Sequence, residues 1–175
     1  MNIKQFRNVC RLLSGLFKVL AGLGIALLIL GFFFTVSTET SSFNFDIDGF
    51  SFFVAQKNHI EEETWSTAAL IIAPLVICLH VYILFKGSAL FDQLTKGYSP
   101  FNSEFTQSVK LISLILIISD ISLPLLYSLI VTFLTDGYYL NIALGNSFVI
   151  GLILYAVAEI FNYGIELQEL SDDTI

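Results

Sequence analysis

The sequence predicts an all-α membrane protein: a bundle of four transmembrane helices with a small extracytoplasmic β-hairpin in the first loop. Four long apolar runs, separated by polar connections, dominate the 175 residues. Each run has about the 20 residues that an α-helix needs to cross a hydrocarbon core of ~30 Å. The composition is 55% hydrophobic and 13% charged, with a mean hydropathy of +0.80, whereas soluble domains are about a quarter charged. We therefore expect one four-span membrane domain over residues 1–175.

The distribution of Lys and Arg predicts the orientation of this domain. The predicted spans cover residues 19–36, 67–85, 111–134 and 142–162. They are joined and flanked by an external loop 37–66, a cytoplasmic helical elbow 86–110 and a cytoplasmic acidic tail 163–175. Lys57 is the one basic residue of the external loop, and the other seven lie in the N-terminal tail and the elbow. Because Lys and Arg favour the cytoplasmic side, we expect a multi-pass protein of the inner (cytoplasmic) cell membrane with both termini in the cytoplasm.

The first two polar segments carry short-range patterns of their own. In the N-terminal tail, Lys4, Arg7 and Arg11 alternate with apolar residues spaced three and four apart, which predicts a short basic amphipathic helix that lies on the inner membrane surface and runs into the first span. In the external loop, apolar residues occupy every second position on both sides of Asp48-Gly49. Because Asp-Gly suits a tight turn with positive φ, the loop is predicted to form a β-hairpin from 43–47 and 50–54.

The second and third helices are predicted to extend into the cytoplasm beyond their spans. Helical spacing of apolar residues continues from the second span to Lys96, where Gly97 is a helix-ending residue. Pro100 restricts the residue before it to extended geometry, and Asn102 or Ser103 can cap the third helix. The elbow is therefore expected to be a rigid helical hairpin. At the other end of the second helix, three acidic residues at 61–63 complement the positive end of the helix dipole.

Two carboxylic acids and one histidine fall inside the predicted spans: Asp120, His80 and Glu159. An ionisable group at mid-membrane is costly and therefore a functional hypothesis. Asp120 and His80 lie at similar depths, so adjacent antiparallel helices could bring them together as a hydrogen-bonded pair that handles protons or cations. The alternative is a structural Asp120, bonded to nearby serines or to backbone freed by Pro124. Glu159 lies near the inner end of its span, where its carboxylate can reach water.

The sequence predicts no enzyme, cofactor or metal site. It contains no catalytic nucleophile motif, no phosphate-binding loop and no Cys/His set with metal-ligand spacing. The basic residues are few and form no recognisable nucleic-acid-binding module, so direct nucleic-acid binding is not expected.

Two stretches resemble a known family. Residues 90–104 read LFDQLTKGYSPFNSE, with Lys-Gly and then Pro-Phe between two helices, and residues 161–170 read FNYGIELQEL before an acidic end. With four spans in a chain of this length, the protein resembles the bacterial membrane family labelled domain of unknown function 2975. That resemblance implies a membrane partner for a small Cro/CI-type helix-turn-helix repressor and implies nothing catalytic. The acidic pair Asp172-Asp173 departs from the family's ending, where an apolar residue commonly follows the Asp.

The predicted function is therefore a non-enzymatic membrane protein that regulates or binds a cytoplasmic partner. Its partners are expected to be the lipid bilayer and a cytoplasmic Cro/CI-type DNA-binding protein, with a homo-oligomer as an open alternative. The alternative functions are a small transporter or channel subunit that uses Asp120 and His80, and an immunity protein against a membrane-active peptide. The residues expected to contact the cytoplasmic partner are Lys96, Gly97, Pro100, Phe101, Glu104, Glu166, Glu169, Asp172 and Asp173.

Overall fold

The computed structural model describes residues 3–37, 50–57 and 60–172 and consists of four long helices and two short strands. In chain order the elements are α1 (Ile3–Ser37), β1 (Phe50–Lys57), α2 (Glu62–Thr95), α3 (Ser103–Leu134), β2 (Tyr138–Leu144) and α4 (Asn146–Asp172). All four helices are long and apolar enough to cross a membrane. Each helix contains most or all of one predicted span. The four helices are therefore consistent with the predicted class, a helical multi-pass membrane protein.

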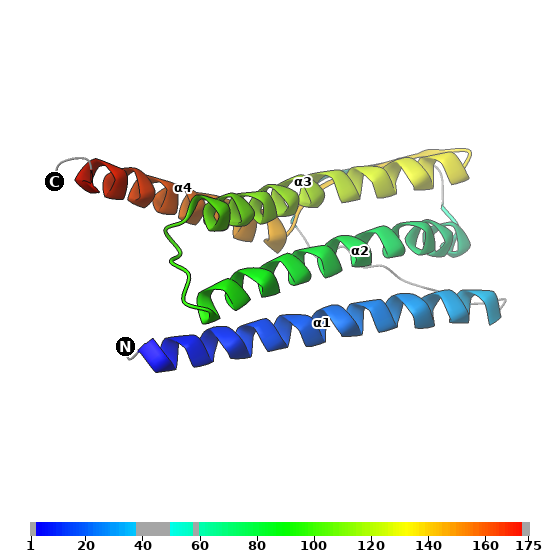
Figure 1. Ribbon diagram of the computed structural model, residues 1–175. Coiled ribbons are helices and arrows are strands. Elements are labelled where there is room, and N and C mark those ends of the chain that lie inside the picture. The colour runs from blue at the N-terminus through cyan, green and yellow to red at the C-terminus, as the bar shows by residue number, and fades with distance from the viewer. Residues whose placement is uncertain (1–2, 38–49, 58–59, 173–175) are drawn as a thin grey trace.

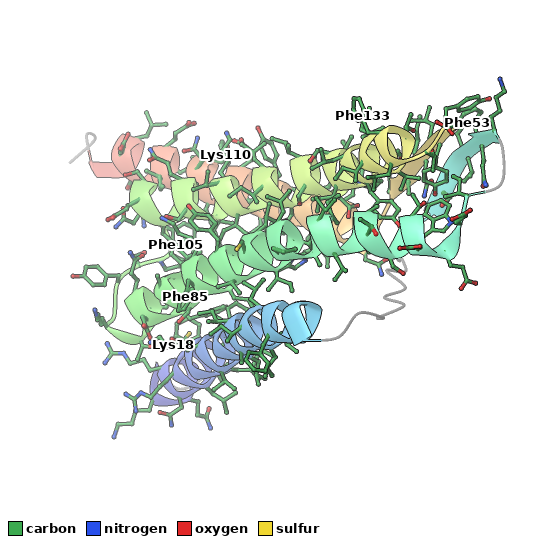
Figure 2. The ribbon with its side chains drawn as sticks, turned by 90° about the vertical axis from the view of Figure 1, so that its right-hand side faces the viewer. Lys18, Phe53, Phe85, Phe105, Lys110 and Phe133 are labelled. Carbon is green, nitrogen blue, oxygen red and sulfur yellow. The ribbon has the colours of Figure 1, made fainter. Side chains whose placement is uncertain are left out.

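The helices lie side by side in chain order (Figure 1). α1 packs on α2, α2 on α3, and α3 on α4, with α1 and α4 at opposite edges of the row. The two termini and the turn between α2 and α3 lie at the same end of the molecule, which we call the inner end. The sheet and the start of α2 lie at the opposite, outer end (Figure 2).

α1 is one continuous helix of 35 residues, about 52 Å long. The N-terminal tail is helical as predicted, but it continues straight into the first span and packs along α2, so it forms no separate surface helix. Ser14 and Ser88 are both buried, and their hydroxyls lie 3.0 Å apart. The ring of Phe17 covers Gly87, where a Cβ would come within 2.7 Å of a ring carbon. These contacts hold the basic segment against α2.

The small two-stranded sheet differs from the predicted hairpin in its pairing. β1, which contains the predicted second arm 50–54, pairs antiparallel with β2, and Phe50 lies opposite Leu144. The predicted first arm, 43–47, lies outside the described residues. Periodicity within the loop could not reveal a partner strand that comes more than eighty residues later in the chain.

The fourth helix begins at Asn146, four residues after the predicted start of its span. Residues 142–144 instead end β2, which runs back along α3 before the chain becomes helical (Figure 1). A short apolar run cannot be assigned to strand or helix by periodicity alone. Here the strand is stabilised by its pairing with β1 and by side chains of α3.

The helices are joined by two buried clusters. At the outer end, α2 and α3 share a core with Ile60. At the inner end, one cluster contains residues from all four helices. Two of them, Leu94 and Phe105, flank the turn between α2 and α3. The members are Cys10, Leu94, Phe105, Val109 and Ala158.

Candidate functional site

The elbow between α2 and α3 has the predicted geometry. Gly97 adopts a φ of +93°, and the backbone N–H groups of Gly97 and Tyr98 donate to the carbonyls of Leu94 and Gln93. This pattern ends α2 with a left-handed residue that favours glycine. Asn102 caps α3, because its side-chain oxygen accepts a hydrogen bond of 2.9 Å from the N–H of Glu104. Both helix ends are therefore set by residues within the elbow.

Phe101 attaches the elbow to α4. Its ring lies edge-on to that of Phe161, with 5.7 Å between the centroids. On the same side it covers Gly164, where a Cβ would lie 2.8 Å from two ring carbons. The missing side chain at Gly164 thus makes room for the ring. Phe101 and the end of α4 are separate in the sequence, and this contact brings them together.

Beyond Gly164, α4 continues past the elbow as an exposed, acidic helix end (Figure 1). Glu166 and Glu169 are exposed, and Glu166 accepts a hydrogen bond of 3.3 Å from the side-chain amide of Asn162. Asp172 is the last residue of the helix, and Asp173 lies outside the described residues. We define the inner-end surface as the elbow residues Lys96, Gly97, Pro100, Phe101 and Glu104 together with Glu166 and Glu169.

On its α1 side, the elbow meets positive charge. A guanidinium nitrogen of Arg7 would lie 2.8 Å from a Cβ at Gly97. Nearby, the carboxylate of Asp92 accepts hydrogen bonds from Lys18 (2.7 Å) and Ser14 (2.6 Å). The bond from Lys18, together with that from Ser14, holds the pKa of Asp92 below its usual range. Asp92 is thereby kept ionised at the junction of α1 and α2.

Asp120 and His80 have separate partners in the structure. The Nδ1–H of His80 donates to the carbonyl of Val76, one turn earlier in the same helix, at 2.8 Å. One carboxylate oxygen of Asp120 accepts hydrogen bonds from the backbone N–H groups of Gly145 and Phe148. Gly145 directly precedes α4 and has no side chain to cap it. Asp120 therefore acts as the N-cap of α4 from a neighbouring helix, a role in which a carboxylate also complements the helix dipole.

Two further hydroxyl groups of α3 continue this arrangement toward the outer end. The Oγ of Ser128 accepts from the N–H of Asn141 at 2.9 Å, and the Oγ1 of Thr132 accepts from the N–H of Tyr139 at 3.0 Å. Thr132 also donates to the carbonyl of Tyr139. These side chains satisfy backbone groups of β2 that do not face β1. In apolar surroundings these backbone groups need hydrogen-bond partners, since an unpaired backbone group there costs several kcal/mol.

Ser128 and Thr132 were not predicted from the sequence, although a signal was present. They follow Asp120 at steps of four residues, with Pro124 between, which places all four positions on one face of α3. That spacing could have indicated a polar stripe. It could not have indicated that a strand, and not a ligand, lies against it.

Glu159 forms an ion pair with Lys110 at 2.5 Å, which joins α4 to α3. The ammonium group of Lys110 also lies 5.0 Å from the ring centroid of Tyr155. Both charged side chains are about two-fifths exposed. The ion pair therefore neutralises the charge of Glu159 while leaving its carboxylate partly exposed.

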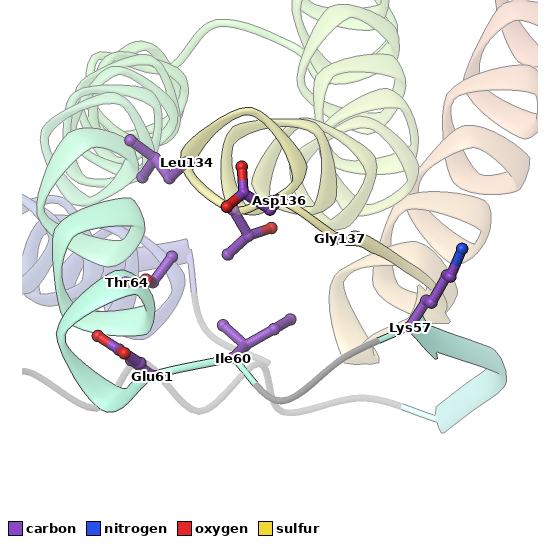
Figure 3. Close-up of a pocket in the computed structure, with 8 residues that line it drawn as sticks. Lys57, Ile60, Glu61, Thr64, Leu134, Asp136 and Gly137 are labelled. Carbon is purple, nitrogen blue, oxygen red and sulfur yellow. The ribbon is translucent and has the colours of Figure 1, made fainter.

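A pocket of about 290 Å³ opens at the outer end, between the start of α2 and the end of α3 (Figure 3). It contains charges of both signs, Lys57 on one side and Glu61 and Asp136 on the others. No three His, Cys, Asp or Glu side chains gather as a metal site among the residues that the structure describes. The lining residues are Lys57, Ile60, Glu61, Thr64, Leu134, Thr135, Asp136 and Gly137.

No family model, curated protein or solved structure matches the chain. The resemblance to the family of unknown function therefore stays a prediction from residues 90–104 and 161–170.

Proposed function

We propose that the protein is a non-enzymatic regulatory membrane protein whose inner-end surface binds a basic cytoplasmic protein. The observation that supports this most is the packing of Phe101 on Gly164 and Phe161. It holds the elbow and the acidic end of α4 as one unit, although α3, β2 and the first part of α4 separate them in the chain. A partner can therefore contact both at once.

The charge of the surface indicates the kind of partner. Glu166 and Glu169 lie within one turn on an exposed helix end, and Asp172 follows in the next turn. Such a patch attracts a basic protein and accelerates its association, with an effect that salt screens. A DNA-binding domain has the complementary charge. The Cro/CI-type helix-turn-helix repressor that the family resemblance implies is therefore the partner that we propose.

The surface also provides apolar contact area. Phe101, which packs against Gly164 of α4, is 42% exposed, and Tyr98, in the same elbow, is 59% exposed. Exposed aromatic side chains within a charged rim are typical of binding hot spots. Because the elbow is already ordered, binding has a smaller cost in conformational entropy. In this proposal the aromatic residues supply affinity and the carboxylates supply orientation.

Transport was the rival interpretation of Asp120. The two hydrogen bonds from the start of α4 to Asp120 favour a structural role, since they use the carboxylate to cap a helix. The separate hydrogen bond of His80 supports the same conclusion.

The proposal is tested by crosslinking in native membranes, followed by affinity purification of the full chain and identification of the recovered proteins. We expect a small basic DNA-binding protein with the wild type and at least tenfold less of it with Glu166→Gln/Glu169→Gln. Gly164→Ala should also reduce recovery, because its new Cβ displaces Phe101. Gly15→Ala is the matched control, since nothing lies within 4 Å of a Cβ there. Equal recovery with all variants, or recovery of no DNA-binding protein, would contradict the proposal.

A further inference from the structure

A line of basic side chains runs along α1 at the inner end. Lys4, Arg11 and Lys18 are spaced seven residues apart, and Arg7 lies between the first two. Since seven residues make nearly two helical turns, the four share one face of α1. Arg7 reaches Gly97, directly after Lys96 at the end of α2. We call Lys4, Arg7, Arg11, Lys18 and Lys96 the basic seam.

The seam retains an excess of positive charge. Asp92 lies within the seam, and its carboxylate forms an ion pair of 2.7 Å with the ammonium group of Lys18. Lys96 is also near enough to Asp92 to act on its charge. The two ion pairs of the described residues are Lys18–Asp92 and Lys110–Glu159, so Arg7 and Arg11 have no carboxylate partner within that part of the chain. An anion is the complementary ligand.

The apolar surface next to the seam favours an anion that carries an apolar part. Ile25 follows Lys18 by seven residues and Ile29 by eleven, so the basic face of α1 becomes an apolar face. These side chains are 40% and 65% exposed, on the helix that forms one edge of the row (Figure 1). Between them and the seam, Gly22 leaves open space, because nothing lies within 4 Å of a Cβ there.

We propose that the basic seam is a binding site for one anionic phospholipid of the inner leaflet. Its headgroup phosphate accepts hydrogen bonds from Arg7 and Arg11, whose guanidinium groups suit phosphate geometry. Its acyl chains lie along α1 over Gly22, Ile25 and Ile29. A free phosphate would use the cations alone, whereas a phospholipid would also contact the apolar face of α1 that continues from them. The site is on the α1 side of the molecule and shares Lys96 with the inner-end surface, but its proposed phosphate ligands, Arg7 and Arg11, lie outside that surface.

The test measures lipid binding to the full chain, purified in a mild neutral detergent. Phosphatidylglycerol and phosphatidylcholine with identical acyl chains are titrated, and bound lipid is counted by native mass spectrometry. We expect phosphatidylglycerol to bind more tightly, and Arg7→Gln/Arg11→Gln to weaken its binding about 25-fold. This estimate takes about 1 kcal/mol, roughly a factor of five, for each cation near a lipid surface.

Two control variants distinguish a lipid site at the seam from general attraction between the protein's cations and an anionic lipid. Lys57→Gln removes a cation from the outer end and should leave lipid binding unchanged, whereas Arg7→Lys/Arg11→Lys, which keeps both charges but loses the guanidinium geometry, should bind more lipid than the double Gln variant and less than the wild type. Equal binding of the two lipids, or equal losses in the Lys57 and Arg variants, would overturn the proposal. So would complete competition by equimolar inorganic phosphate, which would indicate a free-anion site. A change of oligomeric state in the double Gln variant, without loss of lipid, would indicate a protein interface instead.

Discussion

At the scale of single residues, the structure changes the meaning of Asp120. In the sequence it is a carboxylate within an apolar run, which suggests proton or cation handling as readily as structure. In the structure one of its carboxylate oxygens accepts hydrogen bonds from two N–H groups that have no partner within the first turn of α4. Gly145 occupies the position where Ser, Asp or Asn would normally cap a helix. The cap has been supplied by a residue 25 positions earlier in the chain.

Asp120→Ala is expected to destabilise the protein by at least about 1 kcal/mol, the usual effect of losing an N-cap, and by more if the two freed N–H groups stay shielded from water. Asp120→Asn keeps an acceptor oxygen and should lose less than half as much. The measurement is thermal unfolding of both variants in detergent, with Ser122→Ala as a nearby control on the same helix. If the Asn variant folds normally but a proton or ion flux is abolished, the structural role is insufficient and transport becomes the better interpretation.

At the scale of elements, helix packing depends on close approach at a few glycines. Gly151 of α4 lies directly against the backbone of α3, where a Cβ would be 3.0 Å from the carbonyl oxygen of Ser113 and 3.2 Å from the nitrogen of Ile117. A flexible side chain can move aside, whereas a helix backbone cannot without shifting the whole element. Gly151 is thus the contact that sets the spacing of α3 and α4.

Gly151→Ala is therefore expected to destabilise the α3–α4 pair by about 1–3 kcal/mol, the range for overpacking a close interface. Gly31→Ala is the matched control, because a Cβ at that position has nothing within 4 Å. The control should be neutral or stabilising by up to about 1 kcal/mol, since Ala is the better helix former. Unfolding midpoints of both variants in the same detergent check this, and equal midpoints would contradict the packing argument.

At the scale of the whole molecule, the four helices form a row in which the first and last occupy the edges. The termini and the elbow share the inner end, and the sheet and the outer pocket share the other. This separation gives the protein two chemically different ends. The inner end carries the basic seam and the acidic helix end, and the outer end carries a small pocket with charges of both signs.

The orientation predicted from the basic residues is tested by cysteine labelling in intact cells. In a variant with Cys10→Ser and Cys78→Ser, Lys57→Cys should react with a membrane-impermeant maleimide added outside. Glu169→Cys should react after the membrane is permeabilised and not before. Both positions are exposed in the structure, so access does not differ by burial. The reverse pattern would place the termini outside and would also contradict the proposed cytoplasmic partner.

Much of the elbow could be predicted from the sequence because its determinants are local. Gly97 ends α2 and Asn102 caps α3 through bonds to residues within a few positions of themselves. The contact of Phe101 with Gly164 could not be predicted, since no local sequence pattern links two residues so far apart in the chain. The pairing of β1 with β2 was missed for the same reason.

The four helices that are long and apolar enough to cross a membrane, and the local geometry of the elbow, were predictable from the amino-acid sequence. Those features follow from composition, run length and local hydrogen bonding, which the chain expresses over neighbouring residues. Three features became visible in the folded molecule alone: Asp120 caps α4, β2 takes the place of the first turn predicted for the fourth span, and the elbow contacts the acidic helix end. Each of these depends on backbone groups or ring surfaces that find their partners across helices, and such partners are set by packing in three dimensions.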